Sequence, residues 1–185
     1  MIAQKIYSIE HSELTDPKIL SKNAWLVILH ASRIPPHVGL MINSNYNSLT
    51  IKERELNVSQ EALLKTISQK KIETLFVGLK EHPVFSSEHQ LNIFQHQLQQ
   101  FTTVKQGEAT CLSPIKLFFE EFYAVKKDED TLLFDFLDIL NENHYIIETH
   151  SLNIPGKEFT FNAYTSEELQ NRIQQERAAI IKLRS

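Results

Sequence analysis

The stretch IPPHVGLMINSNYNSLTI, residues 34–51, decides the fold class that the sequence predicts. Its two adjacent prolines block a helix and favour an extended chain. The apolar run HVGLMI, residues 37–42, is therefore typical of a strand, and YNSLTI, residues 46–51, of a second strand. Because the intervening residues NSN tolerate left-handed backbone, we predict a β-hairpin with His37 at its open end.

Helix and strand signals alternate on either side of this hairpin. Ser59 can cap one helix, Thr165 and Glu168 form a capping box for another, and Pro114 is tolerated in the first turn of a third. The mixed order predicts an α+β fold in which an antiparallel sheet packs against several helices. Strands are expected at 23–31, 72–79, 144–152 and 156–164, and helices at 57–71, 86–101, 110–125, 130–143 and 165–185.

A chain of 185 residues with 42% hydrophobic content is expected to form a single domain, residues 1–185. Residues 125–185 are too few and too poor in apolar elements to fold alone, so we interpret them as a C-terminal elaboration of a core at 23–124. The charged run KKDED, residues 126–130, resembles a solvated turn more than a flexible linker.

Charge and composition exclude several classes of partner. The formal net charge is −4, and no long basic run favours nucleic acid or an anionic membrane. No apolar stretch is long enough for a membrane span, and the N-terminal segment lacks the pattern of a signal peptide. A single cysteine cannot form an internal disulfide, so the expected location is the cytoplasm. The sequence does not predict whether the chain forms homo-oligomers.

No common cofactor motif is present in the sequence. The chain has four glycines and lacks the phosphate loop, GxGxxG, GxSxG and HExxH patterns, so we expect no cofactor and no metal. The thiol of Cys111 remains, close to the start of a predicted helix, where the helix dipole would lower its pKa. The alternative is that Cys111 is a small buried residue and His37 a polar strand-end residue.

The order of these elements resembles the circularly permuted papain-like fold, which includes permuted NlpC-type peptidases and lecithin retinol acyltransferase. The resemblance covers residues 23–123: HVGL matches the histidine strand, a hairpin and a helix follow, and the cysteine comes later in TCLSPIKLFF. It implies that Cys111 is the nucleophile and His37 the base. Ser48 is the candidate for the third, orienting residue, with Asn47 and Thr50 as alternatives. The polar turn NSN departs from the family's glycine-rich turn.

The resemblance implies a cysteine-dependent amide or ester hydrolase, or an acyltransferase, that acts on a small molecule or a peptide. Whether the chain is an enzyme stays open at this point. A non-catalytic binding or assembly domain on the same scaffold is the alternative. Its support is the broken apolar stripe of the C-terminal helix, which could instead pack on its own sheet: Leu169, Ile173, Ile180 and Leu183. A redox-sensing thiol would need a second molecule, because the chain has no resolving cysteine.

Overall fold

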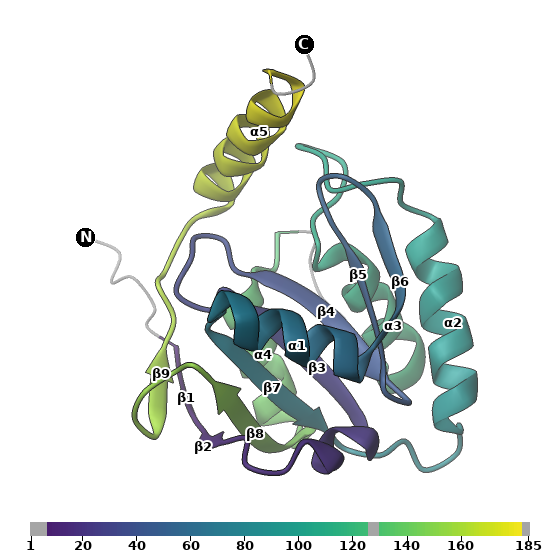
Figure 1. Cartoon of the computed structure of the whole chain (residues 1–185). Helices are drawn as coiled ribbons and strands as arrows, with labels where there is room; N and C mark the ends of the chain where they lie inside the picture. The colour runs from purple at the N-terminus through teal and green to yellow at the C-terminus, as the bar shows by residue number, and fades with distance from the viewer. Residues whose placement is uncertain (1–6, 126–129, 183–185) are drawn as a thin grey trace.

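The fold is built on a seven-stranded sheet with helices on both faces, seen in a computed structural model that describes residues 7–125 and 130–182 (Figure 1). The strand order is β2-β8-β7-β3-β4-β5-β6, and a two-stranded ribbon pairs β1 with β9. The strands are β1 (Ser8–Glu10), β2 (Ser12–Glu13), β3 (Ala24–Leu29), β4 (His37–Ile42), β5 (Asn45–Leu49), β6 (Arg54–Ser59), β7 (Thr74–Leu79), β8 (Ile146–Leu152) and β9 (Glu158–Thr160).

The helices complete a single compact α+β domain. A short 3₁₀-helix covers Pro17–Ser21, and the α-helices are α1 (Gln60–Lys70), α2 (Ser87–Gln99), α3 (Ser113–Tyr123), α4 (Leu133–Glu142) and α5 (Ser166–Lys182). The predicted α+β class is therefore confirmed. The sheet is mainly antiparallel, but β2 and β8 pair in parallel, so it is mixed rather than purely antiparallel as expected.

The central strand β3 divides the core into two layers. All six of its residues are buried, and because side chains alternate across a strand, each face receives three of them. Trp25 and Val27 pack towards Leu63 and Ile67 of α1, which lies in front of the sheet in Figure 1. On the other face the sheet packs against aromatic side chains of α2, α3 and α4: Phe94, Phe118, Phe119 and Phe136.

The β4–β5 hairpin forms as predicted. Asn43 and Ser44 at its turn have φ values of 50° and 59°, the left-handed backbone that a tight hairpin requires. Gly39 of β4 lies beneath the ring of Tyr46 of β5, and a Cβ atom at position 39 would stand 2.5 Å from that ring. The missing side chain thus lets a buried tyrosine close over β4, two residues from His37.

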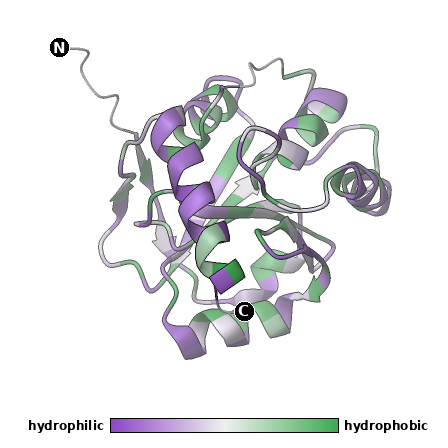
Figure 2. Ribbon diagram, turned by 90° about the horizontal axis from the view of Figure 1, so that it is seen from above, coloured by the Kyte–Doolittle hydropathy of each residue, from purple (hydrophilic) through white to green (hydrophobic). Residues whose placement is uncertain are grey.

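The C-terminal part of the chain is integrated into the domain. β8 lies between β2 and β7, so the segment at 144–152 completes the sheet as expected. The segment at 156–164 does not join this sheet; its strand β9 pairs with β1 in the separate ribbon instead. α5 begins with the predicted capping box. Figure 2 shows the helix that ends at the label C as largely hydrophilic. Of the described side chains of α5, Ile173 is the buried one.

Candidate active site

His37, Ser48 and Glu55 form a row across three neighbouring strands. Ser48 of β5 lies opposite both Gly39 of β4 and Glu55 of β6. His37 is two residues before Gly39, so its side chain projects from the same face of the sheet as that of Ser48. The row is hydrogen-bonded along its length: His37 Nε2 lies 3.1 Å from Ser48 Oγ, and Ser48 Oγ lies 2.8 Å from Glu55 Oε2.

These two hydrogen bonds assign the tautomer of His37. Ser48 has one hydroxyl proton, which it donates to the Glu55 carboxylate. Ser48 Oγ can then only accept from His37, so the imidazole carries its proton on Nε2 and leaves Nδ1 as the basic nitrogen. Among the described residues, Nδ1 has no hydrogen-bond partner. His37 therefore has one nitrogen held by the sheet and the other available as a proton acceptor.

Of the three polar candidates on the second strand of the hairpin, Ser48 is the one bonded to His37. Asn47 Oδ1 instead accepts hydrogen bonds from the Asn57 amide at 2.9 Å and from Gln95 at 3.2 Å. Thr50 stabilises the following turn through its contacts with residues 52 and 53. Sequence reasoning missed Glu55, because β6 was not predicted as a strand; the available signal was an acidic residue seven positions after Ser48.

Cys111 lies beside the backbone of β4, in the turn before α3. The pairing of β4 with β5 ends at Gly39 and Ser48, so Val38 lies just beyond it. The backbone N–H groups of Val38, of Cys111 itself and of Leu112 lie near the thiol and favour its thiolate form. The thiol thus occupies the position where the two strands separate, next to the residue that follows His37.

The expected lowering of the Cys111 pKa is wrong in direction. α3 begins at Ser113 with Leu112 as its N-cap, so Cys111 precedes the helix rather than occupying its first turn. Burial raises the pKa of the Cys111 thiol, because a thiolate loses hydration there. The three surrounding N–H groups favour the thiolate and oppose this effect, but burial is the larger cause. Cys111 is accordingly a neutral thiol at neutral pH.

Burial also keeps His37 neutral. It lowers the pKa of the imidazole from 6.5 to about 4, and the positive charges of His30 and Arg33 act in the same direction. The candidate pair is thus a neutral thiol and a neutral imidazole, rather than a preformed thiolate–imidazolium pair.

A testable consequence is a low pKa for His37, expected near 4 in an NMR titration of the folded protein. Protonation then favours the unfolded state, where the pKa is 6.5, so stability should fall as the pH drops from 6.5 towards 4. The full effect is about 3 kcal/mol, and His37→Gln should remove it from urea unfolding curves. His11 and His30 also have lowered pKa values and stay unchanged in the variant. Equal pH dependence in both proteins would contradict the assignment.

His37 and Cys111 line the same groove, which has a volume of about 490 Å³. Pro35, Pro36 and Glu55 contribute to its wall, and α5 closes one side. The apolar stripe on α5 was expected to pack on its own sheet or on a partner; its described members face this groove: Leu169, Ile173 and Ile180. Leu183, the fourth residue of the stripe, lies outside the described residues.

A second groove of about 710 Å³ meets the first at Cys111. Both grooves are lined by Pro35, Pro36, Thr110, Cys111 and Leu169, but His37 lines only the first. Phe101, Leu132 and Tyr164 give the second groove much of its apolar surface. Cys111 therefore stands at the junction of the two grooves.

Comparison with protein-family models, curated proteins and solved structures found no match for this chain. In the described residues no group of three or more His, Cys, Asp or Glu side chains is arranged to hold a metal ion. Over the same part of the chain, each helix is too short or too polar to cross a bilayer.

Proposed function

We propose that the protein is a cysteine-dependent hydrolase or acyltransferase acting on an amide or ester. The observation that carries this proposal is the shared groove of His37 and Cys111, with His37 oriented through Ser48 by Glu55. The order of the parts, a histidine strand, a hairpin, a helix and then a cysteine before another helix, is also what the resemblance to the permuted papain-like fold implies.

The proposed reaction follows from the two neutral groups. As the Cys111 sulfur attacks the acyl carbon, His37 Nδ1 takes the thiol proton, so a C–S bond forms and the carbonyl oxygen becomes negative. The Cys111 N–H helps to stabilise that oxyanion. Collapse of the tetrahedral intermediate breaks the C–N or C–O bond, and the imidazolium protonates the leaving group. Water or another acceptor then attacks the thioester while His37 Nδ1 takes its proton, and the proton returns to the Cys111 sulfur as the C–S bond breaks.

Glu55 has an electrostatic role in this reaction. Its carboxylate accepts the Ser48 hydroxyl proton, and Ser48 in turn accepts from His37 Nε2. This arrangement holds the ring with Nδ1 available, and it favours the imidazolium that forms after proton transfer. Because burial disfavours that cation, the imidazolium is short-lived and returns its proton readily to the leaving group.

We expect p-nitrophenyl acetate to acetylate Cys111 of the folded protein, because the ester is small and carries an easily displaced leaving group. Stopped-flow release of nitrophenolate, followed by peptide mass spectrometry, should show one acetyl group on the peptide that contains Cys111. The matched variant Cys111→Ser keeps the shape of the side chain and should lose the rapid phase. Equal nitrophenolate release by both proteins, with the acetyl group on lysine, would contradict the proposal.

A non-catalytic binding domain is the second candidate function. The observation that favours it is the raised pKa of Cys111, which a buried structural thiol also shows. This candidate predicts that Cys111→Ser has no effect on the ester reaction. The two functions therefore give opposite results in the same measurement.

A further inference from the structure

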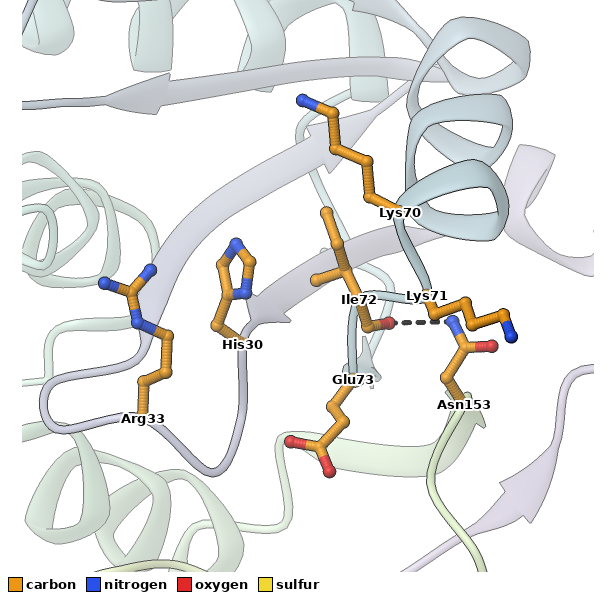
Figure 3. A pocket seen from close by; sticks show the side chains of 7 residues that line it. All are labelled: His30, Arg33, Lys70, Lys71, Ile72, Glu73 and Asn153. Atoms are coloured by element: carbon orange, nitrogen blue, oxygen red, sulfur yellow. Dashed lines mark hydrogen bonds between the residues drawn. The ribbon is translucent and has the colours of Figure 1, made fainter.

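A basic pocket adjoins the candidate active site. It has a volume of about 520 Å³, and Figure 3 shows the side chains that line it: His30, Arg33, Lys70, Lys71, Ile72, Glu73 and Asn153. The pocket lies between the loop after β3 and the C-terminal end of α1. Three permanently cationic side chains thus surround one depression that contains a single carboxylate.

The backbone around this pocket is held in place by hydrogen bonds. Lys71 adopts left-handed backbone and ends α1, and its N–H bonds to carbonyl groups of the last helical turn. Asn153 Nδ2 donates to the Ile72 carbonyl at 2.9 Å, the dashed line in Figure 3. The Ala31 N–H donates to the Glu73 carbonyl at 3.1 Å. The loop that carries His30 and Arg33 is therefore joined directly to the segment after α1.

Two carboxylates lie near the three cationic side chains, so the pocket keeps a net positive charge. Glu73 accepts a hydrogen bond from Ser32, and Figure 3 shows its carboxylate turned away from the ammonium group of Lys70. Arg33 lies 3.5 Å from Glu176 of α5, an exposed pair that contributes little and that a bound anion can replace. Burial is the largest cause that lowers the pKa of His30; the positive charges of Arg33 and Lys70 act in the same direction, and the Glu73 carboxylate acts against them.

The pocket is continuous with the groove of His37 and Cys111, because His30 and Arg33 line both. The basic pocket therefore lies on the side of Cys111 that carries His37. The second groove is lined by Cys111 but not by His37. In the proposed reaction His37 protonates the leaving group, so the leaving part of the substrate occupies the His37 side. The acyl part then lies in the second groove.

We propose that the basic pocket binds an anionic group, a carboxylate or a phosphate, on the leaving part of the substrate. This inference rests on the proposed function for its orientation, since that function defines which part leaves. The substrate is then an amide or ester with an apolar acyl part beside Leu132 and Tyr164, and a leaving part that ends in a negative charge near Arg33 and Lys70. Both Coulomb attraction and hydrogen-bond donation favour such a group there.

The test uses the full chain and two probes, inorganic phosphate and acetate, at low ionic strength. In ¹H–¹⁵N spectra we expect phosphate to shift the amide signals of residues 30–33 and 70–73 in a saturable manner. Lys70→Glu should weaken phosphate binding roughly fivefold or more, because it replaces an attractive charge by a repulsive one. The matched control is Lys65→Glu, the same charge change at an exposed position of α1 outside the pocket, and it should weaken binding by less than about twofold.

Comparison of the two probes distinguishes the possible ligands. Tighter binding of phosphate identifies a phosphate subsite, and equal or tighter binding of acetate identifies a carboxylate subsite. Arg33→Gln provides a second variant on the other side of the pocket and should weaken the same probe. Shifts that are absent, or that Lys65→Glu reduces as much as Lys70→Glu does, would overturn the inference even if Cys111 proves nucleophilic. Saturable shifts with an inert Cys111 would leave the anion site standing and refute the proposed function instead.

Discussion

Replacing His37 by glutamine is expected to slow the acetylation of Cys111 by p-nitrophenyl acetate about 10²–10⁴-fold near pH 7. The reason is the raised pKa of the thiol: with little thiolate present, attack on the ester needs a base to take the proton as the C–S bond forms. Glutamine approximates the size of the imidazole and can still bond to Ser48, but it cannot accept the proton. Stopped-flow measurement of nitrophenolate release gives the rate directly.

The pH dependence separates a catalytic role of His37 from a structural one. At a pH high enough to ionise the thiol without help, His37→Gln should approach the rate of the unmodified protein, because a base is no longer needed. A variant that merely distorts the groove would stay slow at every pH. His96→Gln is the matched control: His96 is exposed on α2, lines neither groove, and should leave the rate unchanged. Equal rates for His37→Gln and the unmodified protein near pH 7 would exclude His37 as the base.

The sequence predicted local structure well where one short-range signal dominates. The apolar run at 37–42 with a polar turn after it predicts the β4–β5 hairpin, and left-handed Asn43 and Ser44 confirm that turn. Ser59 caps α1 by accepting from the Ala62 amide. These features depend on contacts between residues close in the chain, so one sequence is sufficient to recognise them.

The fold could not be predicted where tertiary contacts override the local signal. β6 was missed because its residues are mostly exposed and it lacks an apolar run; pairing with β5 forms it. The parallel pairing of β2 with β8 joins segments far apart in the chain, and no local pattern encodes it. The same limit explains why Glu55 was overlooked, since its role appears only when β6 is placed beside Ser48.

At the candidate site, Ser48 is the one of the three residues left open by the sequence that bonds to His37, whereas the expected direction of the Cys111 pKa shift is wrong. The sequence could not fix the register of the second strand, and the pairing of Ser48 with Gly39 is what brings Ser48 to the His37 face of the sheet. The pKa of Cys111 depends on burial and on where α3 begins, three residues after the predicted start at residue 110, a difference that propensity cannot resolve. The assignment of His37 and Cys111 as a catalytic pair remains a prediction that the ester experiments test.

Removing everything after Ala124 is expected to abolish cooperative folding. The truncated chain loses β8, which pairs with the whole length of β7, and it loses α4, whose buried side chains pack on the sheet: Leu133, Phe134, Phe136, Leu137 and Leu140. Burial of each such side chain contributes about 1.5–3 kcal/mol. Their sum is comparable with the whole stability of a domain, about 5–15 kcal/mol. A thermal melt of residues 1–124 should therefore lack a sharp transition, and its proton spectrum should lack dispersed amide signals.

The matched control removes α5 alone, by ending the chain at Thr165. Of the described residues of α5, Ile173 is the one with a buried side chain. Much of the remaining contact between α5 and the domain is exposed, as in the Arg33–Glu176 ion pair. Residues 1–165 should therefore keep a sharp melt and dispersed amide signals. Because α5 closes one side of the groove, the same chain should also react faster with iodoacetamide at Cys111. A sharp melt for residues 1–124 would show instead that the first 124 residues form an independent core, and that β8 and α4 are additions to it.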